Sequence, residues 1–446
     1  MKNFKTLFSI VFLSIFLSTN ISYSDPSSTF AWVEQISGTT QTLTSVHSSS
    51  GQVVWACGYG GTVIRSSNYG AVWNNVSGNG IPSGAQLINI VSKGSGDIAL
   101  AAGYIGSNTF VYRTFDAGAN WTQVFTEPNG FINALYSDIS NNNMFMTGDP
   151  VGGRWSLWRS TDAGFTWDSS GMYLPQTGAE AGWNNSLFGN GNQLWFGTNN
   201  TKVYYSSNFG SSWIAQPTTG EVNSYSVWFC RIGLPDQATG FIGGSTLQKS
   251  TNSGSNWIPQ TSAGAGNFGG ISGGPNIILD DPTGYLLRFY IRSNIIYSSE
   301  NNGTVWIQDY TAPSGNYRYI GSDYSGLRCW AVRDNGGISY LDLPVGISQT
   351  NSFIPTDFSL NQNYPNPFNP VTQIEFSVPV QGFVSLKVYD ANGREVKTLV
   401  NENKSAGNYK VDFSAISEGS SLSSGIYFYT LISGSYRETK SMIILK

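Results

Sequence analysis

The chain has a single histidine, His47, and this limits the catalytic chemistry it can carry. A Ser-His-Asp or Cys-His site needs an imidazole as general base, so any such site would have to include this residue. His47 lies in a serine-rich stretch without a nucleophile motif. One histidine also cannot form a histidine metal cluster. We therefore expect His47 to be a solvated strand residue, and we expect no metal site and no cofactor.

The three cysteines, Cys57, Cys230 and Cys329, do not predict a metal site either. They have no C-x-x-C spacing and no neighbouring histidine, which a zinc site would need. In an oxidising compartment two of them can form a disulfide, but the sequence does not say which two. Burial of all three as small residues on strands is the simpler expectation.

Hydrolysis of a glycosidic bond remains open, because it needs only two carboxylates about 5 to 10 Å apart. Seven carboxylates outside the repeated motif are candidates: Asp138, Asp149, Glu180, Asp236, Asp280, Asp281 and Asp323. No spacing pairs any two of them, and Asp149-Pro150 and Asp280-Asp281-Pro282 are typical of turns. A secreted glycoside hydrolase acting on a polysaccharide is the enzymatic alternative; we expect a binding module rather than an enzyme.

A repeat defines the elements that must position these residues. The pattern Ser/Thr-x-Asp/Asn-x-Gly-x-x-Trp recurs six times, and its tryptophans lie 48, 46, 46, 44 and 49 residues apart. The Asp or Asn members are Asn68, Asp116, Asp162, Asn208, Asn252 and Asn301. In such a motif the Asp or Asn bonds backbone amides, the Gly takes a positive φ and the Trp packs on the sheet. This period with short strands predicts β-propeller blades.

The two ends of the repeat region predict a seventh blade. Residues 31–35 resemble the Trp-bearing strand of a blade, yet no blade precedes them. Residues 327–341 resemble the middle strands of a blade but lack the final Trp strand. Together they complete one blade, so an N-terminal strand closes the ring and removes its open edges. We therefore predict an all-β protein with a seven-bladed β-propeller over residues 25–345.

The motif copies resemble the Asp-box, or BNR, repeats of sialidases, sortilin-like receptors, xyloglucanases and photosystem II assembly-factor-like propellers. The stretch 148–154 leading into 160–164 resembles the assembly-factor-like group most. The resemblance implies the fold and no particular activity, since one fold hosts many functions. A sialidase is disfavoured, because residues 229–235 match its Arg-Ile-Pro signature only loosely and seven blades are predicted instead of six.

Side chains between the predicted blade strands are the candidates for ligand binding. Aromatic faces stack on sugars, and Arg and Asn offer planar hydrogen-bonding groups. We predict Arg154, Trp155 and Trp183 as ligand-binding residues, with Asn184 and Asn185 beside them. Packing between blades is the alternative role for the tryptophans. The ligand would be a glycan, a peptide or a partner protein; a purely structural surface-layer role is a further alternative.

A different pattern follows a linker predicted at residues 346–356. Residues 357–446 contain alternating strands with Gly and Asn turns, which predict a small Ig-like sandwich. The residues that form recognisable motifs in this segment, here called the marked residues, are Asn363, Tyr364, Pro365, Asn366, Pro367, Phe368, Gly393, Arg394, Gly425 and Tyr427. They closely resemble the type A sorting domain of the type IX secretion system of Bacteroidota. The resemblance implies engagement of that machinery and a secreted, extracellular or outer-membrane surface-attached protein; a generic Ig-like spacer is the alternative.

The N-terminus predicts a secretory signal peptide over residues 1–24. Two lysines, Lys2 and Lys5, precede an apolar run over 7–17 and small residues up to Ser24. This run is too short for a membrane span of ~20 residues, so we expect no stable transmembrane segment. A net charge of −4 with 11% charged residues gives no basic stripe, which excludes nucleic acid as an expected partner.

Overall fold

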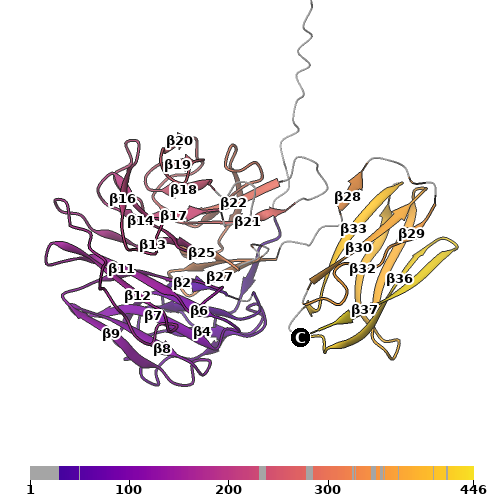
Figure 1. The fold of residues 1–446 in the computed structure, drawn as a ribbon, viewed down its shortest axis with the longest axis horizontal. Coiled ribbons are helices and arrows are strands. Elements are labelled where there is room, and N and C mark those ends of the chain that lie inside the picture. Colours follow the sequence, from indigo (N-terminus) through magenta and orange to yellow (C-terminus); the bar gives the residue numbers. More distant parts are fainter. Residues whose placement is uncertain are drawn as a thin grey trace, which may run out of the picture.

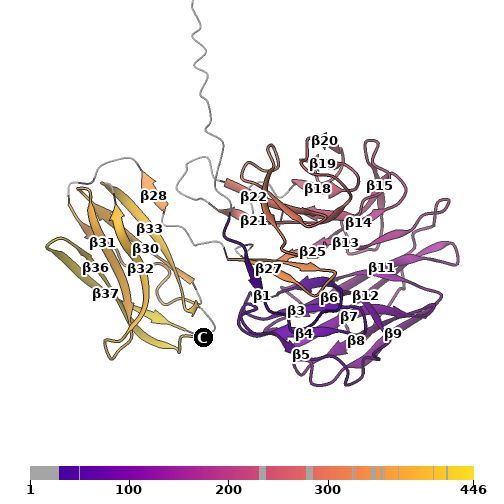
Figure 2. The ribbon, with the colours of Figure 1, turned by 180° about the vertical axis from the view of Figure 1, so that it is seen from behind.

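The computed structural model describes most of the chain as two β-domains without a helix among the described residues (Figures 1 and 2). The described residues are 30–49, 51–230, 238–277, 285–323, 326, 328–342, 348–351, 355, 357–369, 371–404, 406–417 and 420–445. Outside them lie the predicted signal peptide, Asp236 with most of the 229–235 segment, Asp280 and Asp281.

The first domain is a ring of seven antiparallel blades, numbered here in chain order and written from the innermost strand outward. Blade 1 contains β2 (Leu43–His47), β3 (Val54–Gly58), β4 (Val63–Ser66) and β5 (Asn74–Asn75). Blade 2 contains β6 (Gln86–Lys93), β7 (Ile98–Ile105), β8 (Asn108–Thr114) and β9 (Thr122–Pro128). Blade 3 contains β10 (Ile132–Ser137), β11 (Met144–Val151) and β12 (Arg154–Ser160), with a bridge from Arg159 to Asp168 outside them.

The remaining blades follow the same order. Blade 4 contains β13 (Gly182–Asn190), β14 (Gln193–Thr198), β15 (Lys202–Ser206) and β16 (Ile214–Pro217). Blade 5 contains β17 (Ser226–Phe229), β18 (Gly240–Gly243), β19 (Leu247–Ser250) and β20 (Ile258–Gln260). Blade 6 contains β21 (Phe268–Ile277), β22 (Tyr285–Arg292), β23 (Ile295–Ser299) and β24 (Ile307–Thr311). Blade 7 contains β25 (Tyr317–Ser322), β26 (Arg328–Arg333), β27 (Ile338–Asp342) and β1 (Val33–Gln35).

Blade packing explains the sequences of the strands. Each blade lies between two others, so its second strand is buried on both faces and is apolar without alternation, as in Val54–Gly58. The outer strands are exposed, as in Thr122–Pro128. The apolar core consists of clusters between neighbouring blades; one joins Trp55 and Val63 of blade 1 to Leu87 and Tyr112 of blade 2. The ring is therefore stabilised by inter-blade interfaces.

Blade 7 is completed by a strand from the other end of the domain (Figure 2). In β1, Val33 pairs with Tyr340 and Gln35 with Ile338 of β27. The side chain of Glu34 forms an ion pair with Arg333, whose side chain is only 3% exposed, and accepts a hydrogen bond from Ser339. Strands that are distant in sequence thus share the sheet of blade 7 and close the ring.

The six motif copies form one repeated turn. In every copy the Ser or Thr hydroxyl donates to the Asp or Asn side chain at 2.7–3.0 Å and accepts the Gly N–H at 2.8–3.0 Å. In copy three, the two carboxylate oxygens of Asp162 also accept Thr166 N and Oγ1, at 2.9 and 2.6 Å. The Gly has a positive φ, as does the residue before it. The hydrogen bonds that shape each turn are therefore made between residues of the turn itself.

Each motif turn is fixed to the turn that joins the first two strands of the same blade. The backbone N–H after the Asp or Asn donates to a carbonyl of that turn in five blades, for example Ala163 to Asn142 and Tyr69 to Gln52. Both kinds of turn therefore lie on one face of the ring, here called the box face. The turns between second and third strands, and the starts of the innermost strands, lie on the opposite face.

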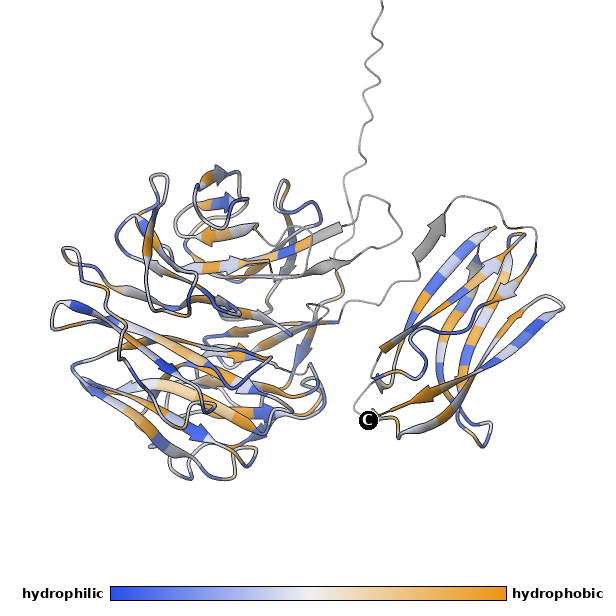
Figure 3. Cartoon of the chain, viewed as in Figure 1, coloured by the Kyte–Doolittle hydropathy of each residue, from blue (hydrophilic) through white to orange (hydrophobic). Residues whose placement is uncertain are grey.

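The second domain is a sandwich of two four-stranded sheets. One sheet has the order β28 (Ser348–Asn351), β33 (Gly407–Ser414), β30 (Val371–Val378) and β29 (Ser359–Leu360). The other has β32 (Glu395–Lys404), β31 (Gly382–Tyr389), β36 (Gly425–Ser433) and β37 (Tyr436–Ile444); β34 (Ile416–Ser417) and β35 (Ser420–Ser421) form a small hairpin. Buried and accessible residues alternate along β30 and β33, as Figure 3 shows by hydropathy. Because β28 pairs with β33, this sheet begins inside the segment predicted to be a linker.

All three cysteines are buried free thiols. Burial raises the pKa of Cys57 to about 12 and that of Cys329 well above the ordinary range. Cys57 and Cys329 are therefore not reactive thiolates at neutral pH.

Candidate functional site

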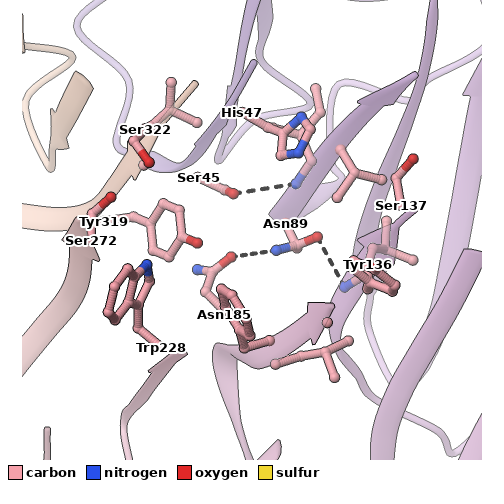
Figure 4. Close-up of a pocket in the computed structure, with 18 of the residues that line it drawn as sticks. Ser45, His47, Asn89, Tyr136, Ser137, Asn185, Trp228, Ser272, Tyr319 and Ser322 are labelled. Atoms are coloured by element: carbon pink, nitrogen blue, oxygen red, sulfur yellow. Dashed lines mark hydrogen bonds between the residues drawn. The ribbon is translucent and has the colours of Figure 1, made fainter. Parts of the chain in front are cut away.

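The innermost strands of all seven blades enclose a cavity of about 360 Å³ on the ring axis, here called the axial pocket (Figure 4). Its wall contains hydroxyl, amide, imidazole and aromatic groups. The labelled members in Figure 4 are Ser45, His47, Asn89, Tyr136, Ser137, Asn185, Trp228, Ser272, Tyr319 and Ser322. The pocket also includes residues at the turns on the box face, such as Ser48, Ser140 and Gly191. It thus extends from the middle of the innermost strands toward that face.

Bulges orient the pocket side chains. Six of the seven innermost strands change register with the second strand near their start, as between Leu43 and Ser45 or between Tyr317 and Tyr319. The pairing of β17 with β18 has no such change. A bulge adds a residue, increases the local twist and re-aims the following side chains. The result is a ring of equivalent positions, including Ser45, Asn89 and Tyr319, directed at the axis from different blades.

Two asparagines cross the ring at this level. Asn89 Nδ2 of blade 2 donates to Asn185 Oδ1 of blade 4 at 2.5 Å, and Asn185 Nδ2 donates to the carbonyl of Thr44 in blade 1 at 3.1 Å. Asn89 Oδ1 accepts the N–H of Leu135 in blade 3 at 3.1 Å. The two amides connect four blades across the axis, as Figure 4 shows in part. We call this the amide bridge; it limits the pocket on the side away from the box face.

Hydrogen bonds also run around the ring between adjacent innermost strands. The N–H of Ile271 donates to Ser226 Oγ at 3.0 Å, and that of Ile90 donates to Ser45 Oγ at 3.4 Å. Together with the Leu135–Asn89 bond, three side chains therefore satisfy the strand-edge amide of the following blade. These polar residues hold neighbouring blades together and line the pocket.

His47 lies in the pocket wall, half-buried, which differs from the predicted solvated strand position. Its Nδ1 accepts the backbone N–H of Ser92 at 3.0 Å and lies 3.0 Å from Ser92 Oγ. Ser92 is fully buried and donates to Ser49 Oγ at 3.2 Å. A serine without access to substrate cannot act as a nucleophile, so this pair joins blades 1 and 2 structurally.

Three pocket groups on different blades have no hydrogen-bond partner among the described residues. Ser137 Oγ is a buried atom without a partner. The Tyr319 hydroxyl and Trp228 Nε1 also line the pocket and form no hydrogen bond to another described group. Burial in the ring raises the pKa of Tyr319 to about 12, so its hydroxyl is a neutral donor at neutral pH. Native proteins rarely leave such groups unpaired unless water or a ligand satisfies them. These groups mark where a polar ligand would bind.

The glycosidase candidates that the structure describes do not form a pair in the pocket. Asp138 lines it, but it is 4% exposed and accepts bonds from Ser140 and Asn141. Asp323 is 2% exposed and faces Arg328. On the opposite face, Glu180 is 2% exposed and bound to Lys202, and Asp149 accepts the N–H of Gly182. No two of these four can flank a substrate bond, so the geometry does not favour hydrolysis.

The predicted ligand-binding residues lie away from the axial pocket, which none of the three lines. Arg154 is exposed at the start of β12, and Trp183 is half-buried near the start of β13 against Tyr225, at 4.4 Å between ring centroids. Their ligand-binding role stays a prediction. Trp155 needs correction, because it is 3% exposed in the core between blades 3 and 4. Asn185, named beside them, is the member that reaches the pocket.

Three of the ten marked C-terminal residues are buried in the sandwich: Asn363, Phe368 and Tyr427. Phe368 is buried, and its N–H and C=O pair with Ile443 and Leu445, which fixes the C-terminal strand. Asn363 donates to the carbonyl of Pro365 at 3.1 Å, in a segment with cis Tyr364-Pro365 and Asn366-Pro367 bonds. Tyr427 Oη donates to the carbonyl of Ser423 at 3.1 Å.

Other residues of this set form turns or lie at the surface. Gly393 has a φ of 78° in the turn that Asp390 caps by accepting Arg394 N at 3.0 Å. Gly425 begins β36. The side chains of Tyr364 and Arg394 are each 80% exposed. These two are therefore the members most available to another protein.

Comparison with known families identifies this domain. A family model for the secretion system C-terminal sorting domain matches residues 362–445. The C-terminal domain is a sorting domain. The resemblance seen in the sequence is thereby confirmed for this part of the chain.

The propeller is similar to two solved structures. One is YCF48 bound to D1 peptide, with 15% sequence identity and a TM-score of 0.53, covering 71% of this chain and 97% of that chain. The other is YCF48 from Cyanidioschyzon merolae, with 15% identity and a TM-score of 0.55, covering 70% of this chain and 99% of that chain. At this identity the likeness establishes the fold, which confirms the predicted propeller. No curated protein matches the sequence.

Two searches of the described residues complete this description. No helix there is long and apolar enough to cross a membrane. Nor do those residues contain a group of three or more His, Cys, Asp or Glu side chains that could hold a metal ion.

Proposed function

We propose that this protein is a binding protein exported by the type IX secretion system and held outside the cell or at the outer-membrane surface. The sorting domain supports export, and the propeller fold supports binding. The propeller would present its axial pocket to a glycan, a peptide or a segment of a partner protein. The sorting domain would engage the translocation machinery through exposed side chains such as Tyr364 and Arg394.

The observation that carries the binding role is the axial pocket with its unpaired donors. Ser137, Tyr319 and Trp228 provide hydroxyl and N–H groups with no partner among the residues described, which a bound polar ligand would satisfy. The described lining of this pocket contains one carboxylate, Asp138, which is already engaged by its neighbours. Recognition without bond cleavage fits this set of groups better than catalysis.

Export is tested by fractionating cells that carry either the full chain or a chain without residues 362–446. We expect the full chain in the medium or on the cell surface and the shortened chain in the periplasm. Within the full chain, Arg394→Ala should lower the exported fraction, because it removes one of the exposed side chains proposed to engage the machinery. Equal secretion of the shortened chain would contradict the export role.

Binding is tested by thermal-shift and calorimetric titration of the exported protein with glycan and peptide panels, together with an assay for released reducing ends. We expect saturable binding without turnover. Release of reducing ends that one Asp or Glu substitution abolishes would instead establish a hydrolase.

A further inference from the structure

We propose that the axial pocket binds an uncharged saccharide, one or two sugar units at the end of a glycan chain, entering from the box face. This inference rests on the proposed binding function and names the class of ligand. Three features of the pocket support this ligand class: the charge of its described lining, its unpaired donors, and the amide bridge at one end.

The described lining of the pocket offers little to an ionic ligand. No Lys or Arg is among the described residues that line it, so an anionic group would be buried without a counter-charge. Lys93 lies nearby, but its Nζ donates to the carbonyls of Asp138 and Asn141. Asp138 is the one carboxylate among the described residues of the lining, and it is engaged by Ser140 and Asn141, so a cationic group would find no free partner at this side chain.

The polar groups of the pocket suit a hydroxyl-rich ligand. Serine hydroxyls from several blades can donate or accept, as can every sugar hydroxyl. Tyr319 and Trp228 supply neutral donors from blades 7 and 5, and Ser137 adds a hydroxyl from blade 3. The Tyr319 ring is half-buried, which leaves aromatic surface for contact with sugar C–H groups. A ligand with hydroxyls in several directions can satisfy all three blades at once.

The shape of the pocket favours the end of a chain over its middle. The amide bridge between Asn89 and Asn185 limits one side, so a ligand entering from the box face must insert its end. The volume of about 360 Å³ lies at the small end of ligand pockets, which span about 300–1,000 Å³. A peptide end carries an ammonium or a carboxylate that this pocket cannot neutralise, whereas the non-reducing end of a neutral glycan carries no charge. This difference favours a saccharide over a peptide terminus.

The test is calorimetric titration of the full exported chain with cellobiose, maltose, xylobiose and mannobiose, with digalacturonate as the charged comparison. We expect at least one neutral disaccharide to bind and digalacturonate not to bind. Tyr319→Phe removes only the unpaired hydroxyl and should weaken binding about tenfold. Tyr317→Phe in the same strand is the matched control, because its hydroxyl is bonded to Ser339 at 2.7 Å outside the pocket and its loss should leave binding unchanged.

Three outcomes would overturn the inference. The first is digalacturonate binding as tight as that of the neutral sugars, and the second is disaccharide binding that Tyr319→Phe leaves unchanged. The third is no disaccharide binding at 10 mM, a concentration about tenfold above a weak Kd of 1 mM. Titration with acetylated and amidated hexapeptides distinguishes a failure of the saccharide inference from a failure of the proposed binding function. If they bind and the sugars do not, the saccharide inference fails and the proposed binding function survives; if neither class binds, both fail.

Discussion

The motif turns and the innermost strands are both repeated around the same ring, yet they are built in opposite ways. In the turns, the same residue types recur and all the bonds of the Ser or Thr, the Asp or Asn and the Gly close within one turn. In the innermost strands, equivalent positions hold different residues, such as Ser45, Asn89 and Tyr319. Ser45 and Asn89 bond to other blades, whereas the Tyr319 hydroxyl has no partner among the described residues. The motif positions, which hold the same residue types in each copy, stabilise the fold. The innermost-strand positions, which differ from blade to blade, include groups without a partner that a ligand can contact.

Blade 7 has no motif turn, so we expect its stability to depend on contacts between distant segments. The ion pair between Glu34 of β1 and Arg333 of β26 is the contact to test. Glu34→Ala leaves the guanidinium of Arg333 buried without its partner, so we expect a loss of about 3 kcal/mol of unfolding free energy. Chemical denaturation measures it. Arg318→Leu in the same blade is the control, since its pair with Asp334 is 55% exposed on the Arg side and should contribute less than about 1 kcal/mol. Similar losses in the two variants would contradict the closure role.

The motif turn itself is tested by Asp162→Ala. The hydrogen bonds from Thr166 outweigh the effect of burial and hold the pKa of Asp162 below its usual value. Their removal should cost about 2 kcal/mol of stability without changing ligand affinity. Asp162→Asn, the residue found in four other copies, should retain most of the stability. A loss of binding by Asp162→Ala in a protein that still melts as the wild type would place ligand contacts in the turns.

The N-terminal segment is also held by Asp309 of blade 6, which accepts Phe30 N and Trp32 Nε1, each at 2.8 Å. Burial raises the pKa of Asp309 to about 6, helped by the nearby Glu300 and opposed by these two hydrogen bonds. The folded state therefore binds this proton more tightly than the unfolded state, whose pKa is 3.8. Stability from this group should be present below about pH 4 and fall as pH rises to about 6, by on the order of 1 kcal/mol. The melting temperature of wild type minus that of Asp309→Asn, measured across this range, should decrease; a constant difference would refute it.

The smallest expected effect lies in the pocket. Ser137→Ala removes a buried hydroxyl that has no partner among the described side and main chains, so stability should stay equal or rise by about 0.5 kcal/mol in thermal unfolding. A neighbouring buried serine with a bond, Ser92, gives the opposite sign when replaced by Ala. If Ser137→Ala destabilises as much as Ser92→Ala, the hydroxyl is structural and the comparison between turns and innermost strands loses its clearest example.

Much of the fold could be predicted from the sequence because it depends on local, repeated chemistry. The hydrogen bonds of each motif turn join residues within a five-residue segment, so the six copies can be recognised as a sequence pattern. The pairing of residues 31–35 with blade 7 could be predicted because the first segment has no blade before it and the last blade has no Trp strand of its own. The sorting domain was visible for the same reason, since its marked residues lie in turns and at strand ends.

The axial pocket could not be predicted in the same way. The amide bridge joins Asn185 to Thr44, which is 141 positions away, and no sequence period relates them. The bulges that direct side chains to the axis leave no mark in residue type. Trp155 was predicted to bind a ligand because it was placed between blade strands, but it lies within β12 and is 3% exposed in the core between blades 3 and 4. The residues that face the axial pocket could therefore be identified only from the three-dimensional structure.

The closure of blade 7 has a consequence for how the chain reaches its folded state. Ser339 donates to Glu34 across 305 positions of sequence, and closing a loop of that length costs roughly 5 kcal/mol of chain entropy. Nothing shorter than the whole repeat region can supply both sides of this sheet. A chain cut before β27 leaves β1 without its partner and an unpaired edge open to association with other chains. Ring closure therefore requires a chain that contains both ends of the domain.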